Sequence, residues 1–210
     1  VIATLANETL LNAFMMEDKQ IHAYLSLLNQ SGVQHLLTYA DAGYMLARFA
    51  RRHSIAMRPL TSIMATGGTL TDDMRTTMAE VFQCRIHNKY GSRDAGEIAC
   101  DCERGSMHVL PHLLIEIVDE QGRSCPPGVT GRVLVTFLGN PSFPLIRFDI
   151  TDRAASAASP CSCGRPFDVL ERLEGRAVDF ITSARGGFVS PVYIRHLVGV
   201  VHGGEKVRRF

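Results

Sequence analysis

The sequence predicts an α/β fold: a parallel α/β layer, then an antiparallel β-barrel-like subdomain, then the start of a small C-terminal α+β domain. In the first 90 residues, apolar positions with helical spacing alternate with short apolar runs, an order typical of a parallel sheet. Helical periodicity then stops, and short alternating segments are separated by Gly and Pro turns. We therefore expect three parts, 1–90, 91–172 and 173–210.

The first part contains three helix candidates and two strand candidates. The strand candidates are 33–39 and 62–66, and the first helix pattern ends at Ser31-Gly32. Asp41 is the expected N-cap of the second helix and Thr71 that of the third. We expect core packing from the three stripes Ile21, Leu25 and Leu28; Met45, Phe49 and His53; and Met74, Met78 and Phe82.

The second part is predicted to be mostly strand. Alternating or extended runs cover 113–118, 133–137 and 144–150. The Ala/Ser-rich segment 154–160 is expected to be a linker that buries little apolar surface. Beyond residue 173 we expect a strand, a glycine turn and a helix over 191–200.

Charge and hydropathy exclude several classes of function. Lys plus Arg is 22 and Asp plus Glu is 21, so the net charge is +1. The chain therefore lacks the excess of positive charge that is typical of nucleic-acid-binding proteins. No apolar run reaches the ~20 residues that span a bilayer, and no signal peptide is visible. We expect a cytoplasmic protein with neither a nucleic-acid nor a membrane partner. Because the first residue is Val, we expect a fragment or a processed chain.

The six cysteines favour a metal site over disulfides. In a reducing compartment, clustered cysteines bind metal or lie buried. Cys100 and Cys102 form one C-x-C pair, Cys161 and Cys163 form another, and His108 follows the first. One Cys/His loop and one Cys pair can form a closed Cys₃His site that suits structural Zn²⁺. The alternative is a few buried thiols and a surface histidine; Cys84 and Cys125 are isolated.

Four further segments could carry chemistry. They are a glycine turn at 65–69, a polar strand end at 88–94, an acidic strand end at 144–152 and a Gly-Arg segment at 174–180. Glycine turns expose backbone N–H groups, and ligands bind at strand ends in open α/β sheets. Each segment alone also has an ordinary explanation, as a turn, a polar loop or a surface ion pair.

Together and in this order, the segments resemble the adenylate-forming, AMP-producing acyl-CoA ligases, and within them the phenylacetate–CoA ligase-like branch. Residues 90–94 match Tyr-Gly-x-x-Glu with Asp94 in the last position, and 160–165 match PCxCGR. Residues 144–152 match PLIRY-x-TGD, with Ile150-Thr151-Asp152 in place of Thr-Gly-Asp. Residues 175–179 match the GRxDD hinge, with Val178 in place of its first Asp.

The resemblance implies that a carboxylate and ATP form an acyl-adenylate and pyrophosphate, and that coenzyme A then gives a thioester. It implies ATP, AMP, Mg²⁺ and coenzyme A as cofactors, and a small carboxylic acid, by family default an aryl acid, as substrate. The nucleotide-binding residues that it implies are Gly67, Gly68, Thr69, Asn88, Tyr90, Gly91, Asp152 and Arg176.

Individual roles follow from the same resemblance. Asn88 would bind the adenine amino group, Tyr90 would stack on the ring, and Asp152 would accept the ribose hydroxyls. Asp94 would stand where the family's catalytic glutamate holds Mg²⁺, with a carboxylate set back by one C–C bond. Val178 and Asp179 would form the hinge.

For zinc, the family's "EC…H" spacing favours Cys102, His108, Cys161 and Cys163, with Cys100 as the rival ligand. The family's Ser/Thr/Gly-rich phosphate loop and C-terminal lysine are not found in the sequence, so we expect no turnover by the chain alone. The alternative function is a non-enzymatic, zinc-stabilised module that binds nucleotide or protein. The sequence leaves open whether the chain forms a homodimer.

Overall fold

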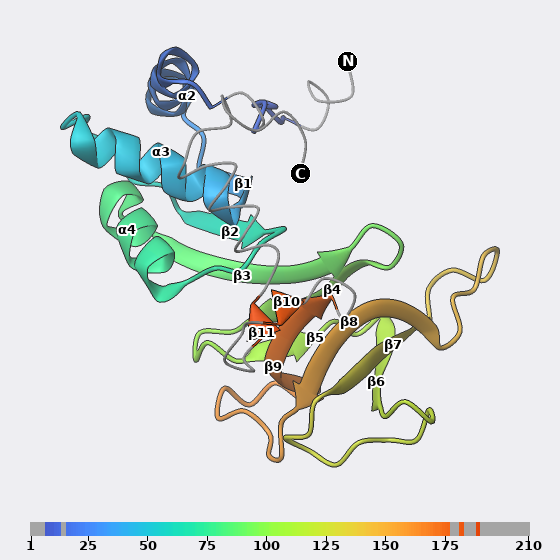
Figure 1. Ribbon diagram of the computed structural model, residues 1–210. Coiled ribbons are helices and arrows are strands. Elements are labelled where there is room, and N and C mark those ends of the chain that lie inside the picture. The colour runs from blue at the N-terminus through green and yellow to red at the C-terminus, as the bar shows by residue number, and fades with distance from the viewer. Residues whose placement is uncertain (1–6, 14–15, 177–180, 183–187, 190–210) are drawn as a thin grey trace. The chain divides into compact units, whose positions relative to one another are not determined.

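The computed structural model describes residues 7–13, 16–176, 181–182 and 188–189 (Figure 1). The chain divides into two compact units, Val1–His87 and Asn88–Phe210. The expected hinge residues Val178 and Asp179 and the expected helix at 191–200 lie outside the described residues. The division into parts at residues 90 and 172 stays a prediction.

Unit 1 is an α/β layer, as the sequence predicts. Strands β1 and β2 pair in parallel, with His35 opposite Ser62 and Tyr39 opposite Thr66. Helix α3 packs against α4 and against both strands (Figure 1). The elements in chain order are α2 (Asp18–Gln30), β1 (His35–Tyr39), α3 (Ala40–Arg52), β2 (Ser62–Thr66), α4 (Asp72–Phe82) and the first residues of β3 (Arg85–Ser92).

The predicted cap of the third helix is confirmed, whereas that of the second is wrong. The Oγ1 atom of Thr71 accepts a hydrogen bond from the N–H of Met74, 3.3 Å away, at the start of α4. Helix α3 has Tyr39 as its N-cap, and Asp41 lies inside its first turn. Because β1 runs directly into α3, no loop residue separates them. Asp41 therefore favours this helix through the helix dipole rather than as a cap.

The core of unit 1 follows the predicted apolar stripes for α2 and α4. Leu25, Met78 and Phe82 have no exposed surface, and Ile63 of β2 is equally covered. The stripe of α3 is rotated from the prediction, because its buried face consists of Ala40, Ala42, Gly43, Leu46, Ala47 and Ala50. Small residues dominate this face. A Cβ on Gly43 would lie 2.8 Å from Met78 Sδ and from Thr38 Cγ2, so α3 packs too closely for a larger residue there.

Unit 2 is an antiparallel sheet in the order β3-β4-β5-β9-β8-β7-β6. With β1 and β2, the described residues form a mixed sheet of nine strands. Within the described residues, the outermost strands of unit 2, β3 and β6, do not pair with each other. The sheet is therefore open, and the expected barrel does not close. The further elements are β4 (Gly96–Asp101), β5 (Met107–Val109), β6 (Leu113–Val118), β7 (Gly131–Phe137), β8 (Phe148–Ser156), β9 (Val169–Arg176), β10 (Ile181–Thr182) and β11 (Phe188–Val189).

The Ala/Ser-rich segment does not form the expected linker at its start. Strand β8 begins at Phe148 rather than in the run from Pro144, and it continues to Ser156. Ala154 and Ala155 are buried, and Ala154 belongs to the apolar core of unit 2. The reason is tertiary: β8 lies between β7 and β9, so its backbone pairs on both sides, and the Ala154 side chain packs into the core on one face of the sheet.

Replacing the confirmed cap should destabilise α4. We expect Thr71→Ala to lower the free energy of unfolding by about 1 kcal/mol, because the Met74 N–H loses its acceptor. Thr76→Ala, an exposed change within the same helix, is the control and should be neutral or slightly stabilising. Urea denaturation measures both. Equal effects of the two changes would show that the cap contributes nothing specific.

Candidate functional site

A buried hydrogen bond between β3 and β8 marks the centre of the candidate site. The Tyr90 hydroxyl donates to Asp152 Oδ2 over 2.6 Å. Tyr90 is 9% exposed and Asp152 is 8% exposed, so water does not supply their partners. The sequence analysis places both residues in the nucleotide site, and the structure brings them into contact from strands 62 residues apart.

Strand periodicity explains why Tyr90 points into unit 2. Successive side chains of β3 alternate between faces, so Asn88 and Tyr90 share one face. Tyr90 packs in the same core as Ile98 and Ile150. Lys89 lies on the other face, where its Nζ contacts Glu97 Oε1 at 2.5 Å. Asn88 is half-buried beside Tyr90 on the shared face.

Two more predicted residues flank this pair. Arg176 stands opposite Asp152 in the register of β8 and β9, which puts the two backbones side by side. Gly91 follows Tyr90 at an irregularity of the β3–β4 pairing. A Cβ on Gly91 would lie 2.6 Å from the Gly96 carbonyl oxygen, so a side chain would push the hairpin strands apart.

Asp94 lies in a turn of unit 2, and the glycine turn belongs to unit 1. Asp94 is exposed in the β3–β4 turn, where Ser92 Oγ accepts the N–H of Ala95 at 3.0 Å. Gly67, Gly68 and Thr69 follow β2 and belong to unit 1, so they are described with that unit alone. Gly67 has φ 67°, and a Cβ there would lie 2.4 Å from the Tyr39 ring.

The four predicted zinc ligands converge on one point. The ligand atoms of Cys102, His108, Cys161 and Cys163 all lie within 4.8 Å of one another. Cys102 Sγ is 3.7 Å from Cys161 Sγ, and Cys163 Sγ is 3.3 Å from His108 Nε2. A tetrahedron with Zn–S of about 2.3 Å and Zn–N of about 2.0 Å has edges of roughly 3.8 and 3.5 Å. The cluster therefore has the dimensions of a zinc site.

Surrounding groups orient these ligands for a metal. His108 Nδ1 lies 3.3 Å from the Phe167 carbonyl oxygen and donates to it, which leaves Nε2 as the lone-pair nitrogen facing the cysteines. The N–H of Arg104 donates to Cys102 Sγ at 3.3 Å. Sequence reasoning missed the Phe167 carbonyl, because a backbone acceptor leaves no residue-type signal.

Hydrogen bonds favour the thiolate form, which a metal requires, at Cys102 and Cys161. The pKa of Cys163 is raised instead, because the Arg165 N–H, which acts to lower it, is outweighed by burial and by the neighbouring Cys161 and Cys102. The Ser106 hydroxyl, followed by the Cys163 N–H, lowers the pKa of Cys161 to about 7. Burial acts to raise the pKa of Cys102, but the N–H groups of Arg104 and Ser106 outweigh it and the pKa is lowered. Cys100, the expected rival ligand, lies outside the cluster, and burial raises its pKa.

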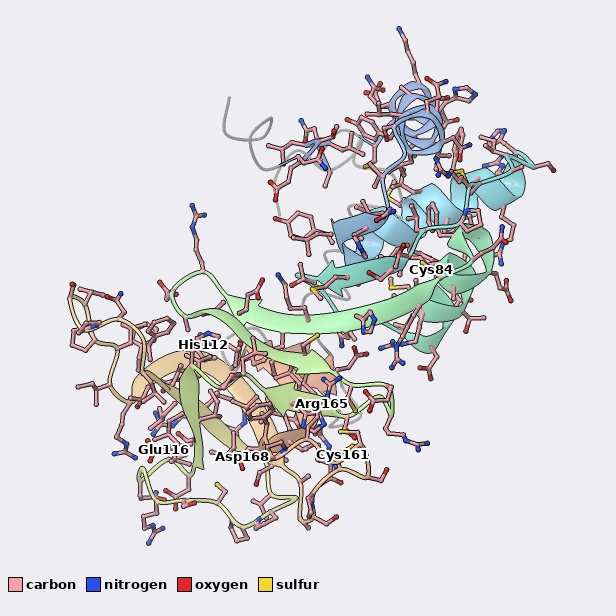
Figure 2. The ribbon with its side chains drawn as sticks, turned by 180° about the vertical axis from the view of Figure 1, so that it is seen from behind. Cys84, His112, Glu116, Cys161, Arg165 and Asp168 are labelled. Carbon is pink, nitrogen blue, oxygen red and sulfur yellow. The ribbon has the colours of Figure 1, made fainter. Side chains whose placement is uncertain are left out.

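A surface ion pair connects the two loops that supply the cysteines. Arg165 Nη2 contacts Glu103 Oε2 at 3.1 Å, two residues beyond Cys163 and one beyond Cys102 (Figure 2). Both side chains are about half exposed, so the pair contributes at most ~1 kcal/mol.

This arrangement of strands and helices is the fold of part of the adenylate-forming ligases. A crystal structure of 2-hydroxyisobutyryl-CoA ligase with R3-HIB-AMP matches with a TM-score of 0.71 and 19% identity, over 85% of this chain and 40% of that chain. Anthranilate CoA ligase AuaEII with anthranoyl-AMP matches with a TM-score of 0.61 and 15% identity, over 89% and 37% of the two chains. Amide bond synthetase McbA from Marinactinospora thermotolerans has a TM-score of 0.61 and 18% identity, over 85% and 38%.

Among curated proteins, the chain is similar to Protein CapK of Staphylococcus aureus. The two are 24% identical over 190 residues, which is 89% of this chain and 41% of CapK. The chain thus spans about two fifths of the length of these relatives. No family model matches it. None of the described helices is long and apolar enough to cross a membrane.

Removing a metal ligand should empty the cluster and weaken unit 2. We expect the purified chain to contain near-stoichiometric zinc and to melt at a lower temperature with a chelator. Cys161→Ser should lower zinc affinity about tenfold or more, whereas Cys125→Ser, outside the cluster, should keep its zinc. Elemental analysis and thermal melts measure this. A metal-free protein whose melting is indifferent to chelator would contradict it.

The Tyr90–Asp152 contact should show in alkaline unfolding. Burial, and then the hydrogen bond to Asp152, raise the pKa of Tyr90 well above its ordinary value. The pKa of Tyr90 is thus higher in the folded than in the unfolded protein. The neutral phenol therefore contributes its full share to the free energy of unfolding below about pH 10, and this contribution is lost as pH rises further. Tyr90→Phe should flatten this alkaline decline and cost about 1–2 kcal/mol at pH 7.

Tyr24→Phe is the control for that experiment, because its hydroxyl makes an exposed contact to a backbone carbonyl in unit 1. Denaturant melts from pH 7 to 11 measure both variants. The interpretation is wrong if Tyr90→Phe leaves the alkaline slope unchanged.

Proposed function

We propose that the chain is part of an AMP-forming acyl (aryl) acid–CoA ligase of the phenylacetate–CoA ligase-like branch. It would activate a carboxylate as an acyl-adenylate and then pass the acyl group to coenzyme A. The observation that carries the proposal is the buried Tyr90–Asp152 pair, set in the fold of enzymes solved with acyl-AMP bound. Two of these solved structures are named as CoA ligases.

The chemistry of unit 2 suits a nucleoside. Asp152 offers carboxylate oxygens that can accept both ribose hydroxyls, and its Oδ2 already accepts a hydroxyl, that of Tyr90. Asn88, on the same face of β3 as Tyr90, offers an amide that can pair with an adenine edge. Tyr90 supplies the aromatic surface beside it. Arg176, opposite Asp152 in the strand register, would assist at the same end of the site.

The reaction would depend on positioning and charge neutralisation rather than on covalent catalysis. Asp94 is exposed, so its carboxylate can reach a nucleotide-bound Mg²⁺, an ion that prefers oxygen ligands and retained waters. Gly67, Gly68 and Thr69 would line the adenine and acyl pocket with backbone groups. The substrate would be a small carboxylic acid, with an aryl acid as the family default, and the location cytoplasmic.

Zinc would have a structural role in this proposal. The four-ligand set is closed, with no position left for substrate, which is typical of structural rather than catalytic zinc. It would fasten the 161–163 turn to the β4–β5 hairpin within unit 2. The zinc cluster also supports the choice of the phenylacetate–CoA ligase-like branch, whose PCxCGR motif this chain matches at 160–165.

The alternative is a non-enzymatic zinc-stabilised module that binds nucleotide or protein, in which Tyr90 and Asp152 only stabilise the fold. Binding of AMP separates the two functions. If the ligase proposal holds, the purified chain binds AMP, since the ribose partners lie within unit 2.

Asp152→Ala should weaken AMP binding at least about tenfold, because two hydroxyls lose a charged acceptor. Asp119→Asn is the control, because this carboxylate lies in the β6–β7 turn and bonds only within it. Isothermal titration with AMP and with adenosine measures both variants. Binding that is indifferent to Asp152→Ala, or no binding by the folded wild type, would refute the nucleotide site and leave the alternative.

A further inference from the structure

Asp152 lies inside an irregular stretch of β8. Residues 150–152 stand opposite a single residue of β7, Val133, because the pairs on either side are Asp149 with Leu134 and Arg153 with Arg132. Bulges of this kind bend a strand and re-aim its side chains, and they often occur beside functional sites. Here Asp152, which contacts Tyr90, is itself one of the bulge residues.

Thr151 has the most unusual backbone conformation in the bulge. Its φ is 65°, in the left-handed region that β-branched residues rarely adopt. Its side chain is exposed, so core packing does not hold it there. The matching position of the resembled ligase motif is glycine, for which this conformation carries no steric penalty. Something else in the chain must therefore stabilise Thr151.

The Asp149 carboxylate provides that stabilisation. Its Oδ1 accepts the N–H of Thr151 at 2.8 Å, which closes a tight turn over the bulge. Its Oδ2 accepts from Arg132 Nη1 at 2.6 Å. Arg132 in turn donates from Nη2 to the Asp119 carbonyl at 3.3 Å, which fixes the guanidinium against the neighbouring β6–β7 turn. One carboxylate thus links β7 to the backbone amide next to Asp152.

We propose that Asp149, oriented by Arg132, is a positioning residue that holds Asp152 toward Tyr90 and thereby prepares the ribose acceptor. The evidence that Asp149 positions Asp152 is the set of contacts between β7 and β8. Only the expected effect on nucleotide affinity rests on the proposed function. An acceptor oxygen at residue 149 is the essential feature, since Asn can also close such a turn.

The test uses the full 210-residue chain with ¹³Cζ-labelled tyrosine, in which the Tyr90 signal is assigned by its loss in Tyr90→Phe. Asp149→Ala should shift the Tyr90 signal and weaken AMP binding about fivefold or more. Asp149→Asn should stay close to wild type, because it keeps the acceptor. Thr151→Gly should be tolerated, and the Asp149→Ala change should have a smaller effect in the T151G background, because glycine needs no anchor at that φ.

Asn140→Ala is the matched control, because its side-chain oxygen also accepts a backbone N–H, that of Phe143, in an exposed loop, but makes no contact with Asp149, Arg132 or Asp152 among the described residues. It should leave the Tyr90 signal in place. If Asp149→Ala does not fold, Arg132→Gln carries the test and should shift the same signal in the same direction by a smaller amount.

The proposal is overturned if Asp149→Ala leaves the Tyr90 signal unchanged, or if its effect is as large in the T151G background. It is equally overturned if Arg132→Gln has to carry the test and gives no shift. Absence of AMP binding by the wild type would end the proposed function, whereas the Tyr90 signal would still decide the positioning role. The two failures are therefore distinguishable.

Discussion

The buried carboxyl group of Asp152 sets the requirement that the rest of unit 2 has to meet. A carboxyl group removed from water is costly unless its oxygens find hydrogen-bond donors. Tyr90 supplies one such donor from β3, at 2.6 Å. Strand periodicity turns this face of β3 inward, and the hydrogen bond lets the apolar core of unit 2 accommodate the tyrosine hydroxyl. The same carboxyl group is the one that the proposed function assigns to ribose.

Two local devices shape unit 2 around that pair, the bulge of β8 and the Cys/His cluster. The bulge turns on Thr151, whose backbone is left-handed and whose N–H donates to Asp149. The cluster brings Cys161 and Cys163 to within metal-binding distance of Cys102 and His108. A threonine at a left-handed φ is strained, and the carboxylate that accepts its N–H is also paired with Arg132.

The two devices also differ in how they respond to conditions. The Cys/His cluster depends on thiolates, so metal binding there releases protons and weakens as pH falls. The Tyr90–Asp152 contact depends on a neutral phenol, so it weakens only in strong alkali. A metal-loaded cluster and the Tyr90–Asp152 contact would therefore have opposite pH dependence.

The sequence by itself determined the helices of unit 1 with strong apolar periodicity, the Thr71 cap, strands β6 and β7, and the candidate ligand and nucleotide residues. These features depend on local spacing and on residue type, which are visible in one dimension. It could not determine that α3 begins at Ala40 with Tyr39 as its N-cap, that Ala154 and Ala155 are buried in β8, or that the sheet stays open. Tertiary structure alone decided these points, and also the Phe167 carbonyl at His108 and the Asp149 anchor at Thr151. Each depends on which strands pair and in which register, and pairing joins residues far apart in the sequence.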